Sequence, residues 1–82
     1  MQPRVTATKI IQMPQTSWGD VWAAMIGGTL TPQAIALLRW WEDALDADAV
    51  QYAIDETALA ARPSIRYTIA ILRRIAHERS NL

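Results

Sequence analysis

Residues 63–79 read PSIRYTIAILRRIAHER, and this stretch decides the fold class of the chain. Apolar residues recur in it at the three-and-four spacing of a helix, on one stripe: Ile65, Ile69, Leu72 and Ala76. A second stripe, about a quarter-turn away, is cationic: Arg66, Arg73 and His77. A third stripe of the same helix holds Tyr67, Ile71 and Arg74. The sequence therefore predicts a helix with one side against a core and a cationic side with an aromatic residue next to it.

Local signals outward from this stretch predict three further helices. The predicted N-terminal caps are Ser17, Thr31, Asp46 or Asp48, and Ser64 or its neighbour. Asp20 follows Ser17 at the spacing of a capping box, and Pro32 suits the first position of a helix. Gly27 and Gly28 are expected to end the first helix in the left-handed conformation. Pro63 separates the third helix from the last.

Each of the three earlier helices has a predicted apolar face. In the first it is Trp18, Val21, Trp22, Met25 and Ile26, and in the second it is Ile35, Leu38, Trp41 and Leu45. The third has a narrow face of small residues: Val50, Ala53, Ile54, Thr57 and Ala61. With no strand pattern, the prediction is an all-α fold, a small bundle of about four helices. Residues 1–15 are expected to be an extended arm and residues 16–82 the helical domain.

Composition sets further bounds on the class of protein. Eighty-two residues form one small domain, and domains of this size are marginally stable alone, so self-association is expected. Cysteine is absent, which fits a reducing interior. No apolar run approaches the ~20 residues that cross a bilayer, and the N-terminus has no signal-peptide block. We expect a cytoplasmic protein with no membrane partner.

The charges are balanced overall but separated along the chain. The formal net charge is zero, which argues against a strong whole-surface nucleic-acid binder. Residues 40–61 carry only acids: Glu42, Asp43, Asp46, Asp48, Asp55 and Glu56. Residues 62–82 carry five arginines against one glutamate, a net charge of +4 with histidine neutral. Either the two blocks pair inside the bundle, or the basic block is a binding face.

The sequence offers little material for catalysis. One histidine and no cysteine exclude a His/Cys metal cluster, and no HExxH, P-loop or GxGxxG pattern occurs. The serines Ser17 and Ser64 are explained as caps, and His77 complements the negative end of the last helix. We therefore expect a protein that is not an enzyme and that holds no cofactor or metal.

The sequence has more residues suited to binding a nucleic acid than to catalysis. Arginines near Tyr67 can contact a phosphate backbone, and the phenol can stack on an unpaired base. The candidate contacts from the pattern are Arg62, Arg66, Tyr67, Arg73, Arg74, His77 and Arg79. The alternative is a solvated face with a packing tyrosine. Trp40 and Trp41 point about 100° apart, so Trp40 either meets a partner or spans two neighbouring helices.

The chain resembles the C-terminal DnaD domain family of replication-initiation proteins of Gram-positive bacteria and their phages. The resemblance covers about residues 21–74 and includes GTLTP at 28–32, LLRWWEDAL at 37–45, VQYAIDETA at 50–58 and PSIRYTIAILRRI at 63–75. The last helix of the family carries a Tyr-x-x-x-Ile-x-x-x-Trp pattern. Here Tyr67, Ile71 and Leu72 match the pattern and its continuation, whereas Ile75 stands where the family has Trp.

The resemblance implies an all-helical domain acting in DNA replication initiation. Family members bind DNA through this helix, which adds Ile71 to the candidate contacts, and they support helicase loading in a primosome. The first hypothesis is therefore a DNA-binding or primosome-accessory module, for single- or double-stranded DNA. The second is an adaptor that docks on a replicative helicase or helicase loader through Trp40, the acidic third helix or the N-terminal arm. The third is a small helical homo-oligomer that has lost the family activity.

Overall fold

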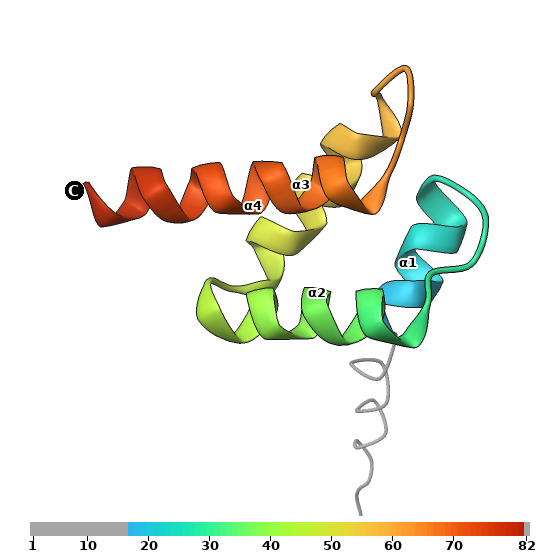
Figure 1. Cartoon of the computed structure of the whole chain (residues 1–82), viewed down its shortest axis with the longest axis horizontal. Coiled ribbons are helices and arrows are strands. Elements are labelled where there is room, and N and C mark those ends of the chain that lie inside the picture. Colours follow the sequence, from blue (N-terminus) through green and yellow to red (C-terminus); the bar gives the residue numbers. More distant parts are fainter. Residues whose placement is uncertain (1–16, 82) are drawn as a thin grey trace, which may run out of the picture.

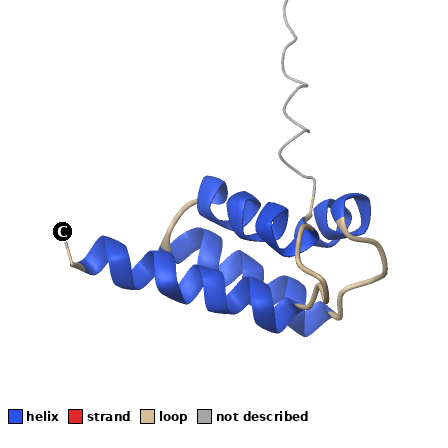
Figure 2. Cartoon of the chain, turned by 90° about the horizontal axis from the view of Figure 1, so that it is seen from above, coloured by secondary structure: helices blue, strands red, loops and turns tan. Residues whose placement is uncertain are grey.

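Four α-helices make up the part of the chain that this computed structural model describes, residues 17–81 (Figure 1). They are α1 (Trp18–Met25), α2 (Pro32–Ala44), α3 (Ala47–Ala58) and α4 (Ile65–Ser80). Only helices and loops occur in these residues (Figure 2), so the predicted all-α bundle is confirmed. The predicted arm, residues 1–15, lies outside the described residues. None of the described helices is long and apolar enough to span a bilayer.

Side-chain caps begin all four helices at positions that the sequence predicted. Each capping oxygen accepts the backbone N–H three residues on: Ser17 Oγ at 3.2 Å, Thr31 Oγ1 at 3.1 Å, Asp46 Oδ1 at 2.7 Å and Ser64 Oγ at 3.2 Å. Of the two predicted acids, Asp46 takes the cap of α3. Loss of one such cap costs about 1 kcal/mol. After α1, Gly27 and Gly28 adopt φ values of 105° and 80°, where a side chain would be strained.

Helix α3 is the centre of the bundle and packs against each of the other three helices. Its buried face has no exposed surface: Val50, Ala53, Ile54 and Thr57. These small side chains allow the other helices to approach closely. Leu38 of α2 and Leu72 of α4 complete the fully buried set of large apolar residues. Figure 1 shows α2 and α4 on either side of α3, in accord with the packing of α3 against both.

Polar contacts tie neighbouring helices together. The hydroxyl oxygens of Thr57 on α3 and Thr68 on α4 lie 2.6 Å apart in the core, and both side chains are fully buried. At the edge of the bundle, the Trp18 indole N–H donates to Glu42 Oε1 at 2.8 Å and joins α1 to α2. Because a buried hydroxyl is costly unless it is bonded, the threonine pair fixes the register of α3 against α4.

Three details of the predicted helices are wrong. Ala61 was assigned to the inward face of the third helix, but α3 ends at Ala58 and Ala61 is exposed. The Leu59 N–H bonds to the Glu56 carbonyl, which tightens the last turn and ends the helix early. Met25 is 46% exposed because it is the last residue of a helix of only eight residues. The last helix begins at Ile65, after its cap, and not at Pro63.

Candidate nucleic-acid interface

The solvent side of α4 carries the surface that the sequence singled out. We call it the basic ridge: Arg66, Tyr67, Ala70, Arg73 and Arg74, all of them exposed. The opposite side of α4 is buried, through Thr68, Ile69, Ile71 and Leu72. Tyr67 is 45% exposed, so its phenol is not part of the core. The helix period therefore separates an aliphatic side that holds the bundle from a cationic side that faces water.

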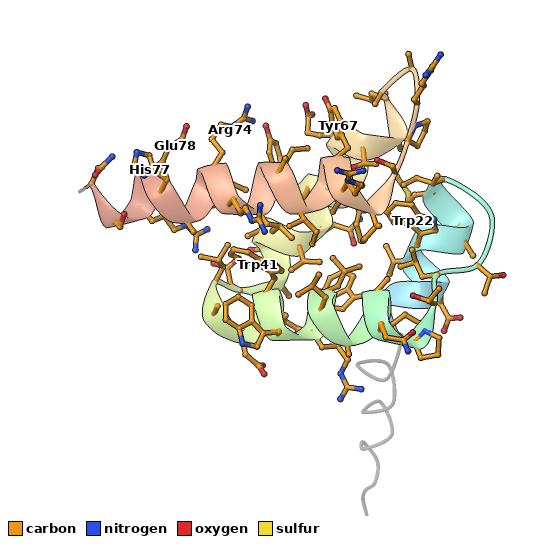
Figure 3. The ribbon with its side chains drawn as sticks, viewed as in Figure 1. Trp22, Trp41, Tyr67, Arg74, His77 and Glu78 are labelled. Atoms are coloured by element: carbon orange, nitrogen blue, oxygen red, sulfur yellow. The ribbon has the colours of Figure 1, made fainter. Side chains whose placement is uncertain are left out.

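The ridge has two rows of side chains, separated by Ala70. Arg66 and Arg73 are seven residues apart, which is about two turns or ~10 Å along the helix axis. Tyr67 and Arg74 repeat the same spacing on the neighbouring row. Figure 3 shows Tyr67 and Arg74 along the edge of α4 that faces away from α2. Because Ala70 has the smallest side chain of the ridge, a ligand can reach both rows across it.

Each row of the ridge borders a depression in the surface. The α2/α4 groove, of about 560 Å³, has a mainly apolar lining with one amide and two guanidinium groups: Ala34, Leu37, Ile65, Ile69, Gln33, Arg66 and Arg73. The α3/α4 hollow, of about 260 Å³, is smaller and more polar: Glu56, Tyr67, Ala70, Ile71 and Arg74. Ala70 lines both. The two rows thus present different surroundings, an apolar groove on one side and a mixed hollow on the other.

Pairing between the acidic and basic blocks is limited to one contact in residues 17–81. Arg79 Nη1 lies 3.0 Å from Asp46 Oδ2, and both side chains are about half exposed. The Ala49 amide that bonds to Asp46, reinforced by the hydrogen bond from Arg79, lowers the pKa of that carboxyl. No other salt bridge within 4.0 Å joins side chains of the described residues. The arginines of the basic ridge are therefore not neutralised by α3.

Two predicted DNA contacts do not belong to this surface. Ile71 is only 6% exposed and packs in the core, so it is not part of the exposed ridge; the buried side of α4 extends further around the helix than the apolar stripe predicted. Its small exposed part lines the α3/α4 hollow. Arg79 is engaged with Asp46 at the far end of α4 and does not share the face of the ridge. Both residues therefore lie outside the basic ridge, and their contact with DNA stays a prediction.

Arg62 and His77 are exposed but lie at the ends of the ridge. Arg62 belongs to the loop that joins α3 to α4. His77 is in the last turn of α4, and its Nε2 lies 3.2 Å from Asn81 Nδ2. A ligand on the ridge would have to extend past one of its ends to reach either of them.

Trp40 forms a separate exposed feature on α2. Its side chain is 58% exposed, and its ring meets that of Trp41 edge to face, with centroids 5.0 Å apart and an interplanar angle of 89°. Leu37, one turn earlier, is 41% exposed. Trp41 is half-buried and packs against the core, as the inward stripe predicted. The Trp40 ring therefore packs against the ring of Trp41, and most of the Trp40 side chain is exposed to solvent.

One residue of the site was not foreseen from the sequence. Glu56 was placed in the acidic block, but the structure brings it into the α3/α4 hollow with Tyr67 and Arg74. That these three residues line one hollow depends on how α3 lies against α4, which no local sequence pattern encodes. In residues 17–81, no three His, Asp or Glu side chains lie close enough together to hold a metal ion.

No family model, curated protein or solved structure matches this chain. The resemblance to the DnaD C-terminal domains therefore remains a prediction from the residues quoted above. At the position of the family tryptophan, Ile75 is half-buried and packs against the core. Any aromatic contact made from the ridge would come from Tyr67.

Proposed function

We infer that this protein is a non-enzymatic DNA-binding module that contacts DNA through the basic ridge of α4. One observation carries the proposal: Arg66, Arg73 and Arg74 are exposed on one helix and have no salt bridge with any described residue. Guanidinium groups in this state can bind phosphates and release the counterions that surround DNA. Their number is small, so the expected affinity is modest and falls steeply as salt rises.

Tyr67 supplies the second element of the proposal. A half-exposed phenol one residue from Arg66 can stack on an unpaired base while the arginines hold the backbone. The assignment to replication initiation, as a primosome-accessory module, rests on the resemblance to the DnaD C-terminal domains. It is supported by the four-helix architecture and by the outward position of Tyr67.

A binding titration tests the proposal. Fluorescence anisotropy of labelled single- and double-stranded oligonucleotides is measured at about 50 and 200 mM salt, where phosphate contacts differ strongly in strength. The double variant Arg73→Glu/Arg74→Glu is expected to bind at least ten-fold more weakly. Arg39→Glu, an exposed arginine of α2 outside the ridge, serves as the control for a general charge effect. Undetectable binding at low salt, or equal binding by the double variant, would contradict the proposal.

The second candidate function is an adaptor that docks on a replicative helicase or helicase loader without touching DNA. The observation that favours it is the exposed pair formed by Trp40 and Leu37, since large aromatic side chains are frequent anchors of protein interfaces. This function predicts a complex that survives charge reversal on the ridge but is lost in Trp40→Ala. Tyr52→Ala, which removes an aromatic of α3 that is 47% exposed, is the matched control. A pull-down in which Trp40→Ala has no effect would exclude this use of Trp40.

A further inference from the structure

Glu56 places a carboxylate inside a surface that otherwise attracts phosphates. It comes from the last turn of α3 and lines the α3/α4 hollow with Tyr67 and Arg74. A carboxylate at this position repels the DNA backbone, because the charges have the same sign. If DNA lies on the basic ridge, the group nearest to Glu56 must therefore be something other than a phosphate.

The fold itself gives no reason for the carboxylate. In the last turn of α3 an acid faces the negative end of the helix dipole, which is unfavourable. Asp55, the residue before, accepts a hydrogen bond from Gln51 at 2.9 Å, whereas Glu56 has no salt bridge with Arg74 or any other described residue. Glu56 and Arg74 thus line one hollow without neutralising each other.

Tyr67, Arg74 and Glu56 together carry groups that can bind the base and the phosphate of one nucleotide. A phenol offers a flat face for a base, a guanidinium binds phosphate, and an ionised carboxylate only accepts hydrogen bonds. On the Watson–Crick edge, guanine alone among the DNA bases has two neighbouring donors, N1–H and N2–H, which can meet both oxygens of one carboxylate. The hollow of about 260 Å³ lies below the ~300–1,000 Å³ of sites that enclose drug-sized ligands, so it suits one base at most.

We propose that the α3/α4 hollow selects a guanine of single-stranded DNA, with Tyr67 stacked on the base, Glu56 accepting from N1–H and N2–H, and Arg74 on the adjacent phosphate. The inference rests on the proposed function and adds to it a strand type and a base. A duplex cannot use this site, since its Watson–Crick edges are occupied by pairing. Glu56 is then the residue that sets specificity, while the arginines set affinity.

The test compares oligothymidines that differ at one central position. Fluorescence anisotropy is measured with guanine, inosine, adenine or cytosine at that position; inosine keeps N1–H but lacks the N2 amino group. The wild-type chain is expected to bind the guanine oligonucleotide at least about five-fold more tightly than the inosine one. In Glu56→Gln this preference should fall to near one, while the affinity for plain oligothymidine stays equal or rises. Asp43→Asn, an exposed acid of α2, is the control with the same charge change.

The outcomes separate this inference from the proposed function. Equal binding of all four oligonucleotides, or a guanine preference that persists in Glu56→Gln, overturns the inference and leaves DNA binding by the ridge intact. Absence of binding to every oligonucleotide overturns both. A guanine preference that is lost in Glu56→Gln and kept in Asp43→Asn supports the site as described.

Discussion

Thr57 of α3 and Thr68 of α4 place their hydroxyl oxygens 2.6 Å apart in the core, with no exposed surface on either residue. Thr57 Oγ1 also lies 2.7 Å from the Ala53 carbonyl, whereas Thr68 Oγ1 is 3.3 Å from that of Ser64. The shorter distances favour a chain in which Thr68 donates to Thr57 and Thr57 donates to Ala53. This chain holds α4, and with it the basic ridge, in register on α3.

The threonine pair gives a prediction for stability. Thr57→Val should cost about 1–2 kcal/mol, since the buried hydroxyl of Thr68 then loses its acceptor. Thr68→Val should cost less, because Thr57 keeps its bond to the Ala53 carbonyl. The double variant should cost less than the sum of the two, because neither hydroxyl is left behind. Urea unfolding followed by circular dichroism checks this, and strict additivity would contradict the coupled chain.

The cap of α3 gives a prediction for pH dependence. The folded pKa of Asp46 lies below its ordinary value of 3.8, chiefly through the bond from the Ala49 amide and then through Arg79. The ionised cap therefore adds stability above pH 3.8, and this contribution is lost as the pH falls through the folded pKa. Asp46→Asn keeps a capping side chain without a titrating group. Its melting temperature should lie below that of the wild type at neutral pH and converge with it as the pH falls through the folded pKa of Asp46.

The matched control for this experiment is Asp43→Asn, an exposed acid of α2 that caps no helix. It should follow the wild type over the whole pH range. A gap between Asp46→Asn and the wild type that does not narrow in acid would show that the charge of Asp46 is not the stabilising element.

Stacking by Tyr67 is tested by two substitutions of different size. Tyr67→Ala should weaken binding to single-stranded DNA by about 1–3 kcal/mol, the usual contribution of one stacked base. Tyr67→Phe should bind nearly as the wild type does, because the ring is retained. Neither change should greatly affect folding, as the side chain is 45% exposed. Equal affinities of Tyr67→Ala and Tyr67→Phe for single-stranded DNA would show that Tyr67 does not stack on a base.

The salt dependence counts the phosphate contacts. For single strands, each contact contributes about 0.7 to the slope of log K against log salt concentration. Arg74→Gln should reduce the slope by about that amount, and Arg66→Gln and Arg73→Gln should do the same. Arg39→Gln, on α2, should leave it unchanged. Equal slopes for all four variants would mean that the ridge does not hold the backbone.

The sequence predicted the features that depend on neighbouring residues. The caps at Ser17, Thr31 and Ser64 are examples, because a hydroxyl and an amide three residues on meet whenever a helix starts there. The division of α4 into a buried and a cationic side was also predicted, since it follows from the helix period alone.

The rest depends on how the helices lie against one another. Asp46, the cap of α3, pairs with Arg79 of α4, and Glu56 of α3 lines one hollow with Tyr67 of α4. No local pattern states which turn of one helix faces which turn of the other. Ile71 illustrates the same limit: the family resemblance placed it among the candidate DNA contacts, but the packing of α3 against α4 leaves it only 6% exposed.

The central claim is that DNA lies on the solvent side of α4, and a backbone-amide NMR titration with a single-stranded oligonucleotide tests it directly. The account predicts that the largest chemical-shift changes follow the basic ridge, at residues 66, 67, 70, 73 and 74, with a further change at Glu56. The exposed side of α2 around Arg39 should not respond. Absence of changes in α4, or changes centred on Trp40 instead, would contradict the account.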